Sequence, residues 1–225
     1  MSLDLKFNVA GMSASISPFP APFQRDDLPT PTVMTVSPLS ARSVSELVAL
    51  SGPQVETRRL ILRPPEIEDF AGYSEMMADP ISVAFSGRGP LKGDEAWTRF
   101  LRQAGHWSTF GYGSFSVIER DSGRYIGEVG FSHYNRNLGG HFDWAPEACW
   151  TVCAEAQRQG YASEAIAGAI AWMEHRLGTS RTVCVIHVRN AASLRVAEKM
   201  GFRTFRKGLF RGYEALFMER VTAGI

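Results

Sequence analysis

The residues best suited to chemistry lie where an expected strand, residues 147–153, runs into a helix expected over residues 161–177. The connection contains Gln157 and Arg158 and ends at Gly160, directly before the helix. A first helical turn offers free N–H groups and the positive end of the helix dipole, and glycine lets the backbone approach a phosphate closely. The junction is therefore a candidate anion site, although an isolated glycine in such a loop more often serves only as a tight turn.

A second junction follows the strand expected over residues 182–188. Asn190 could simply cap the short helix expected over residues 191–200, and Ser193 could be an ordinary helix serine. Taken one at a time, neither junction decides between a structural and a chemical role.

Apolar periodicity predicts the elements that must position these junctions. Alternation with period two favours strands, and apolar residues three and four apart favour helices. Strands and helices in this order predict an α/β (α+β) fold built on one mixed sheet. The expected strands are residues 57–63, 113–120, 124–134, 147–153, 182–188, 203–207 and 213–219, and the expected helices are residues 66–78, 94–106, 161–177 and 191–200.

Proline is concentrated at the start of the chain. Seven of the twelve prolines fall in the first 54 residues. Proline removes a backbone donor and pushes the residue before it toward extended geometry, which disfavours a helix or a central strand. We expect residues 1–54 to be a proline-rich N-terminal arm, partly ordered against a folded body or second subunit, or else disordered. Residues 55–225 are expected to form the folded domain.

The overall composition excludes several function classes. The chain carries 24 Lys and Arg against 23 Asp and Glu, so its net charge of +1 creates no global field to gather nucleic acid or an anionic membrane. Three cysteines and five dispersed histidines predict neither a disulfide scaffold nor a metal site, and no apolar stretch is long enough to span a membrane. We expect a cytoplasmic protein with no nucleic-acid or membrane partner. A local basic cluster consists of Lys199, Arg203, Arg206, Lys207 and Arg211.

Together, the two junctions resemble motifs of the GCN5-related N-acetyltransferase (GNAT) superfamily, in particular its ribosomal-protein N-terminal acetyltransferase (RimJ/RimL-like) branch. Residues 157–162 match the family pattern Gln/Arg-x-x-Gly-x-Gly/Ala. Asn190 and Ser193, followed by Lys199-x-Gly-Phe, match a second pattern. Residues 57–64 look like the first strand of the branch, and the resemblance covers roughly residues 57–219.

The resemblance implies a mixed, mostly antiparallel GNAT sheet of six to seven strands flanked by helices. Its fourth and fifth strands, residues 147–153 and 182–188, would splay apart. Acetyl-CoA would be the co-substrate, with its pantetheine arm in the gap and its pyrophosphate at the start of the helix that follows. The residues implied to bind it are Trp150, Val152, Gln157, Arg158, Gln159, Gly160, Tyr161, Ala162, Asn190, Ser193 and Lys199.

The resemblance also implies direct transfer of the acetyl group to a primary amine, on a protein N-terminus or a small molecule. That reaction needs a neutral amine, a donor for the carbonyl oxygen and a proton source for the thiolate. Glu147 is the candidate base and Ser193 the candidate proton donor, while Ala197 stands where many members carry a tyrosine for that role. Glu147 could instead be an exposed strand-end carboxylate. The chain could also be an acyl-CoA-binding regulatory module without turnover, and a homodimer is open.

The acceptor pocket is expected among aromatic residues of the helical segment and hairpin that wall it in the family, although such residues are more often core. His133 is the titratable group to watch there. The full set is Phe85, Trp97, Trp107, Phe110, Tyr112, His133, Tyr134 and Trp144.

Overall fold

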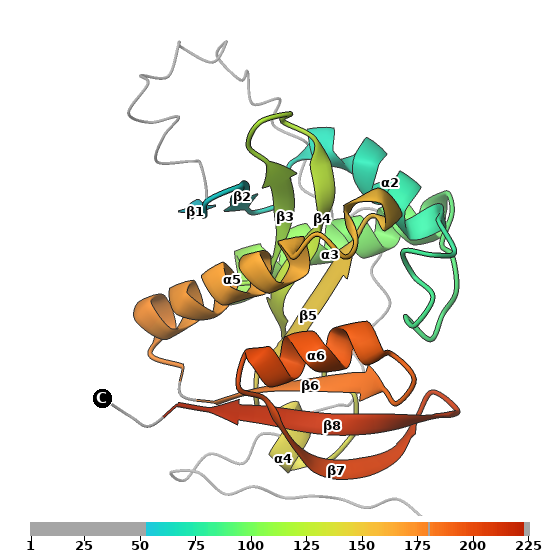
Figure 1. The fold of residues 1–225 in the computed structure, drawn as a ribbon, viewed down its shortest axis with the longest axis vertical. Coiled ribbons are helices and arrows are strands. Elements are labelled where there is room, and N and C mark those ends of the chain that lie inside the picture. Colours follow the sequence, from blue (N-terminus) through green and yellow to red (C-terminus); the bar gives the residue numbers. More distant parts are fainter. Residues whose placement is uncertain (1–52, 180, 223–225) are drawn as a thin grey trace, which may run out of the picture. The chain divides into compact units, whose positions relative to one another are not determined.

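Eight strands form one mixed sheet in this computed structural model, which describes residues 53–179 and 181–222 (Figure 1). The spatial order is β1-β2-β3-β4-β5-β6-β8-β7, and each neighbouring pair is antiparallel except the parallel pair β5 and β6. This confirms the predicted mixed, mostly antiparallel sheet. The strands are β1 Val55–Glu56, β2 Leu60–Arg63, β3 Ser114–Glu119, β4 Tyr125–Ser132, β5 Glu147–Val152, β6 Arg181–His187, β7 Arg203–Phe210 and β8 Tyr213–Val221.

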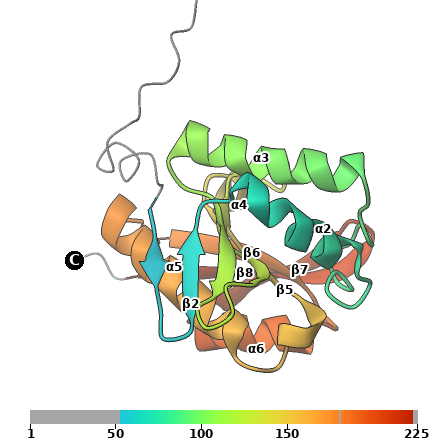
Figure 2. The same cartoon turned by 90° about the horizontal axis from the view of Figure 1, so that it is seen from above.

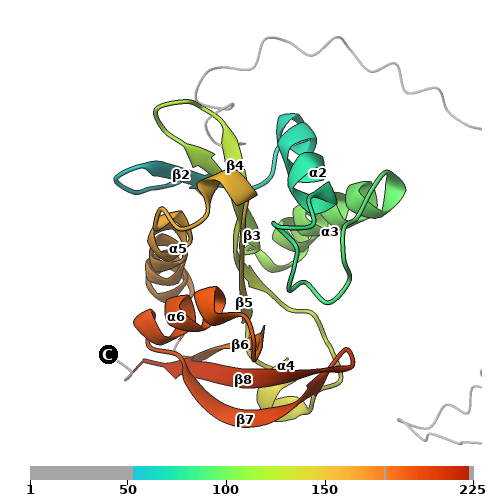
Figure 3. The same ribbon diagram turned by 45° about the vertical axis from the view of Figure 1, so that its right-hand side comes forward.

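Helices cover both faces of the sheet. α5 and α6 lie on one side, and α2 and α3 lie on the other (Figure 2, Figure 3). A site that opens through the sheet can therefore take one wall from each helical layer. The helices are α2 Phe70–Ala78, α3 Asp94–Phe110, α4 Gly140–Asp143, α5 Tyr161–Leu177 and α6 Ala191–Lys199, with 3-10 turns η2 Ile67–Asp69 and η3 Ala154–Ala156.

The apolar stripe of α5 fixes that helix on the sheet. Ile166, Ala169 and Met173 recur at helical spacing and are fully buried in the core with Leu62 of β2. Burying a side chain of the size of Ile166 contributes about 1.5–3 kcal/mol. Gly178 ends the helix in the left-handed conformation, with a φ of 59°. The start of α5 is thereby held at a fixed place beside β5.

β5 and β6 separate soon after they meet. Their one ladder pair in the described residues is Glu147 with Val183, where Val183 N donates to Pro146 O at 3.0 Å. By contrast, β5 pairs with β4 along its whole length, and β6 does the same with β8. The predicted splay between these two strands is therefore confirmed.

The start of the domain differs from the prediction. Residues 57–59, expected as part of a strand, form the turn of the β1–β2 hairpin, in which Thr57 N donates to Leu60 O at 2.9 Å. The sheet has eight strands rather than six or seven, because the two-residue β1 has too little sequence to show any alternation. The short α4 lies between the strands expected over residues 124–134 and 147–153, where the sequence predicts no helix. Residues 1–52 of the expected arm lie outside the described residues, and the domain boundary stays a prediction.

Candidate active site

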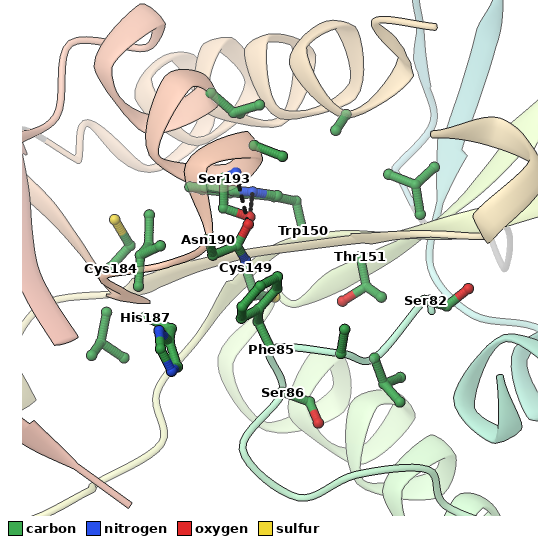
Figure 4. A pocket seen from close by; sticks show the side chains of 18 of the residues that line it. Ser82, Phe85, Ser86, Cys149, Trp150, Thr151, Cys184, His187, Asn190 and Ser193 are labelled. Atoms are coloured by element: carbon green, nitrogen blue, oxygen red, sulfur yellow. Dashed lines mark hydrogen bonds between the residues drawn. The ribbon is translucent and has the colours of Figure 1, made fainter. Parts of the chain in front are cut away.

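A cavity of about 1330 Å³ opens where β5 and β6 separate, and it takes walls from both sides of the sheet. On one side, which we call the α5–α6 half, it is lined by the first turns of α5 and α6. On the other side, the α3 half, it is lined by the segment 81–91, by α3 and by the loop after β4. Ser193 and Asn190 lie at the start of α6, and Phe85 comes from the segment opposite them (Figure 4).

The edge of β5 that faces the cavity carries free backbone groups. Successive residues of a strand direct their N–H and C=O groups to opposite sides. Cys153 N donates to β4 at 2.9 Å, whereas Pro146 O accepts from β6 at 3.0 Å, so the backbone groups of Trp150 and Val152 face away from β4. One of them, Val152 O, accepts from the Gln157 amide at 3.2 Å. An extended ligand chain could pair with this edge as an added strand.

The first turn of α5 presents N–H groups to the same cavity. Gly160 precedes the helix with a φ of 82°, a left-handed conformation that favours glycine. The first helical bond runs from Glu164 N to Gly160 O at 3.0 Å, and no side chain caps this end. Tyr161, Ala162 and Ser163 line the cavity, and their N–H groups have no partner within the helix. This end of the cavity is suited to a phosphate group.

The β1–β2 hairpin holds this turn in place. Glu164 accepts from the Thr57 hydroxyl at 2.7 Å and from the N and Nε of Arg59, each at 2.8 Å. Arg59 also donates to Gln159 O at 3.1 Å and lies 4.2 Å from the ring centroid of Tyr161. Burial tends to raise the pKa of Glu164, but these hydrogen bonds outweigh it and hold the pKa below its ordinary value. The sequence does not reveal this role of Arg59 and Glu164, because no local pattern indicates that hairpin and helix meet.

All but one of the predicted coenzyme-binding residues line the cavity. The exception is Gln159, whose amide donates to Glu155 O at 2.7 Å and whose carbonyl accepts from Arg59. The fold thus brings the two sequence junctions to one space. The residues that line it are Trp150, Val152, Gln157, Arg158, Gly160, Tyr161, Ala162, Asn190, Ser193 and Lys199.

Ser193 and Trp150 connect the two junctions. Trp150 Nε1 donates to Ser193 Oγ at 3.2 Å (Figure 4). Ser193 N donates to Asn190 Oδ1 at 3.1 Å, so Asn190 does cap α6. This cap uses the amide oxygen and leaves the amide nitrogen for a ligand in the cavity.

Glu147 is buried where β5 and β6 meet. It is 6% exposed, and its two carboxylate oxygens accept from Arg136 at 2.6 and 2.9 Å. Burial raises the pKa of Glu147, and the paired guanidinium of Arg136 opposes that rise. The alternative of an exposed strand-end carboxylate is therefore wrong. Arg136 follows β4 in a loop, and no motif in the sequence indicates it as the partner of Glu147.

Cys149 lies two residues further along β5. Burial raises the pKa of its thiol to about 11, and its Sγ lies 3.3 Å from Ser114 Oγ. A thiol with such a pKa stays protonated at neutral pH and is a poor nucleophile. Cys149 is therefore not suited to carry an acyl group.

Most of the aromatic residues expected to wall the acceptor pocket do not line the cavity. Phe85 and Tyr134 line the cavity. His133 instead donates through its backbone N to His106 Nε2 at 2.8 Å, a bond that joins the loop after β4 to α3. The aromatic residues of the expected set that do not line the cavity are Trp97, Trp107, Phe110, Tyr112, His133 and Trp144.

The expected basic cluster is divided between different surroundings. Lys199 and Arg211 line the cavity from opposite halves. Arg206 lies 3.9 Å from the ring centroid of Phe217, and Lys207 pairs with Glu214 at 3.3 Å. Arg203 donates to the carbonyl of its own neighbour.

Metal ligands do not gather in the described ranges: no group of three or more His, Cys, Asp or Glu side chains there could hold an ion. Nor does any helix among the described residues have the length and apolar character needed to cross a membrane.

Comparison with known proteins decides the family. Residues 59–203 match the family model described as an acetyltransferase (GNAT) domain. The chain belongs to the GNAT acetyltransferase family. This GNAT domain is 26% identical over 167 residues to the uncharacterized N-acetyltransferase YoaA of Bacillus subtilis (strain 168), covering 72% of this chain and 88% of the relative.

Solved structures of other GNAT proteins share the fold. A putative GNAT-family acetyltransferase from Bordetella pertussis is 32% identical, with a TM-score of 0.68 and coverage of 75% of this chain and 99% of that one. Spermidine N-acetyltransferase from Vibrio cholerae, in complex with CoA and spermine, has a TM-score of 0.61 at 17% identity, covering 75% of this chain and 98% of that one. The second likeness shows the fold alone.

Membership of the GNAT family confirms the predicted fold and the predicted enzyme class, an acyltransferase. A GNAT fold binds acetyl-CoA. The residues present fit that ligand, because an open strand edge suits its amide-containing arm and an uncapped helix start suits its phosphates. The ribosomal-protein branch stays a prediction.

Proposed function

We propose that this protein transfers an acetyl group from acetyl-CoA directly to a primary amine, on a protein N-terminus or a small molecule, while both substrates are bound. The observation that carries the proposal is one cavity that reaches the open edge of β5, the start of α5 and the buried Glu147. Both substrates can meet in that space, so no covalent carrier on the protein is required.

The coenzyme is bound mainly by backbone groups. The edge of β5 at Trp150 and Val152 pairs with the amides of the pantetheine arm, as a neighbouring strand would. The N–H groups at Tyr161 and Ala162 bind the pyrophosphate, and Gly160 leaves room for it. This mode of binding explains why the chain needs no large net positive charge.

Side chains around these backbone groups complete the coenzyme site. Gln157 and Arg158 add donors beside the pyrophosphate, Asn190 binds the pantetheine arm through its amide nitrogen, and Lys199 meets the 3′-phosphate. Gln159 contributes by its position in the loop, since its amide and carbonyl are bonded within the protein.

Ser193 supplies a proton to the departing sulfur. An indole N–H can donate but cannot accept, so the bond from Trp150 makes Ser193 Oγ an acceptor and leaves the hydroxyl proton for another partner. A thioester sulfur that receives this proton as its bond to carbon breaks is a better leaving group. Ala197 offers no alternative donor on α6.

Glu147 acts as the base that makes the amine neutral, directly or through a water molecule. A protonated amine has no lone pair with which to attack, so a proton acceptor is needed at neutral pH. Burial of Glu147 raises its pKa and makes it a stronger base than an exposed carboxylate. Arg136 holds both oxygens and fixes the carboxylate in one orientation.

A second candidate is an acyl-CoA-binding regulatory module of the same fold with little turnover. The observation that favours it is the Arg136 pair itself, because a carboxylate with both oxygens bonded to a guanidinium is a weakened base. Ala197, which stands where many relatives carry a tyrosine as proton donor, also favours the regulatory module.

A screen for acetyl transfer across amine classes, following the released thiol, separates the two candidates. Turnover with any amine supports the enzyme. Binding of CoA in isothermal titration without thiol release from any class supports the regulatory module, and absence of CoA binding overturns both.

Three further predictions remain to be tested. The three unpaired cysteines support a reducing compartment, and we infer a cytoplasmic location from them. Light scattering of the full chain tests for a homodimer. Acetylation of ribosomal-protein N-terminal peptides tests the predicted branch.

A further inference from the structure

The α3 half of the cavity is lined by arginine to an unusual degree. Within the described lining of the whole cavity, Glu147 is the one acidic side chain. The net charge of the full chain is only +1, so this concentration is a property of the site and not of the composition. The arginines of this half are Arg88, Arg99, Arg102, Arg136 and Arg211.

Two of these arginines are neutralised by buried carboxylates. Arg136 pairs with Glu147 at 2.6 Å. Arg99 pairs with Glu128 at 2.7 Å, and Glu128 is 2% exposed. Each of these two guanidinium groups thus has a carboxylate partner in the wall, and no described carboxylate pairs with the other three.

Arg211 lies at the tip of a β-hairpin that borders the cavity. It forms the two-residue turn of the β7–β8 hairpin with Gly212, and both residues have positive φ, 54° and 84°. Positive φ at both central residues is what a two-residue β-hairpin turn requires, so this geometry fixes the place of Arg211 in the turn. Arg211 donates to Ser86 O at 3.1 Å, which ties the hairpin to the opposite wall. Burial, then repulsion from Arg88 and Arg136, lowers the pKa of Arg211.

Arg102 is the second unpaired guanidinium of this wall. It projects from α3 and lies 5.7 Å from the ring centroid of Tyr134. Arg136 lies 4.2 Å from the same centroid. The Tyr134 ring, which lines the cavity, therefore contacts two cations in the α3 half.

The coenzyme does not account for these charges. Its phosphates belong in the α5–α6 half, where the start of α5, Arg158, Arg195 and Lys199 line the cavity. Ser193 lies in the first turn of α6, and the Trp150 side chain reaches it from β5 (Figure 4). Arg88, Arg102 and Arg211 line the opposite half, which the amine must occupy.

We propose that the acceptor is a small amine that also bears a carboxylate, such as an amino acid, and that Arg102 and Arg211 bind this carboxylate with Arg88 beside them. The inference rests on the proposed acetyl transfer and adds the substrate class. Guanidinium groups bind carboxylates through paired, charge-assisted hydrogen bonds. A polyamine would instead bring several positive charges into a wall that is already positive.

The carboxylate takes no part in the chemistry. A bond forms between the acceptor nitrogen and the acetyl carbon, and the bond from that carbon to sulfur breaks. The nitrogen loses a proton to the base, and the sulfur gains one. The arginines therefore act on recognition, so their removal is expected to change KM far more than kcat.

Matched pairs of acceptors test the proposal. Thiol release is followed with wild-type protein and amino acids, with the carboxamides of the same amino acids, and with spermine. The amine of a carboxamide is less basic and is more often neutral, so intrinsic reactivity favours it. We expect kcat/KM for the free acid to exceed that for its carboxamide by about tenfold or more.

Variants connect that preference to the residues. Arg102→Gln and Arg211→Gln are expected to raise KM for the acid about ten- to hundredfold each, while kcat and the KM for acetyl-CoA change less than about threefold. The preference for acid over carboxamide should collapse in both. Arg124→Gln, which removes one exposed arginine from the β3–β4 turn outside the cavity, should leave both constants unchanged.

The outcomes distinguish this inference from the proposed function. Transfer to spermine or to a carboxamide at least as fast as to the acid overturns the acidic acceptor and leaves acetyl transfer intact. An unchanged preference in Arg102→Gln and Arg211→Gln also overturns it. Absence of thiol release with every amine overturns the proposed function and this inference with it.

Discussion

The indole nitrogen of Trp150 donates to the hydroxyl oxygen of Ser193 across the splay, at 3.2 Å. One residue comes from β5 and the other from the first turn of α6, so the bond joins the two motifs that the sequence singles out. It also makes the serine oxygen an acceptor. With its oxygen accepting from the indole, the hydroxyl proton can be given to a ligand in the cavity.

Replacement of this serine tests its role in proton transfer. Ser193→Ala is expected to lower kcat about a hundredfold, the effect of losing a positioned acid, while the KM for acetyl-CoA changes little. Trp150→Phe is the matched control, because it removes the indole donor and keeps the hydroxyl, and it should cost much less. Steady-state kinetics of thiol release gives both constants. A Ser193→Ala variant with the kcat of wild type would show that the sulfur needs no donor here.

Two substitutions of Gly160, by Asp and by Asn, differ in charge and hardly in shape. A side chain added here would meet Arg59 Nη2 at 3.6 Å, an ordinary contact, so space alone does not forbid it. Asn and Asp are nearly equal in size, and both tolerate the left-handed conformation better than other residues. We expect Gly160→Asp to bind CoA about a hundredfold more weakly than Gly160→Asn in isothermal titration, because a carboxylate would stand beside the pyrophosphate. Equal affinities would remove the phosphate from this end of α5.

The sequence predicts those parts of the site that depend on local pattern. The α5 stripe, the cap at Asn190 and the loop before Gly160 are contiguous in the chain, and each is present where periodicity and turn chemistry place it. The splay itself is predicted from the family resemblance. The partners of buried charges follow no such pattern. Arg136, in the loop after β4, meets Glu147 at the start of β5 because that loop folds back over the strand, and no spacing in the sequence encodes that contact.

The same limitation applies to the β1–β2 hairpin, where a strand was expected over the residues that form the turn. Arg59 takes part in no ladder pair and instead turns back to bond Glu164. Apolar periodicity cannot predict this turn, because its contact with Glu164 joins residues that are 105 positions apart in the chain.

Loss of that hairpin contact should loosen the pyrophosphate loop. Arg59→Ala is expected to weaken CoA binding several-fold and to lower the free energy of unfolding by about 1 kcal/mol, since the ion pair is partly exposed. Arg58→Ala is the control, because that side chain is exposed and neighbours Arg59 in the same turn. Titration calorimetry and thermal unfolding measure the two effects. Full CoA affinity in Arg59→Ala would show that the loop needs no support from the hairpin.

Acid should weaken the same contact. The pKa of Glu164 is lowered in the folded protein, so its contribution to stability is present above the ordinary pKa of the carboxyl and is lost as the pH falls through the lowered value. The difference in unfolding free energy between wild type and Glu164→Gln is therefore expected to shrink toward acid pH. Denaturant unfolding at a series of pH values measures it. A difference that grows on acidification would contradict the assignment.

The Glu147–Arg136 pair gives the pH dependence of turnover. A base must be deprotonated to act, so kcat/KM should rise with pH through the raised pKa of Glu147. Arg136 opposes the rise of this pKa, so Arg136→Gln should shift the rising limb of the plot of kcat/KM against pH to higher pH. Glu147→Gln should remove that limb and lower activity about a hundredfold. A limb that belongs to the acceptor's own amine shifts when the acceptor is exchanged for one of different basicity, whereas a limb that belongs to Glu147 does not.

Folding must be followed alongside these rates, because removing Arg136 leaves a buried carboxylate without its partner. Arg136→Gln is expected to lose about 3–5 kcal/mol of stability, and the double variant with Glu147→Gln should recover part of that loss. If Arg136→Gln stays folded and its kcat/KM rises over the same pH range as in wild type, the Glu147 carboxylate is not the group whose titration controls turnover. Glu147 would then be a positioning residue that holds Arg136, and through it the Tyr134 ring, at the acceptor side of the cavity.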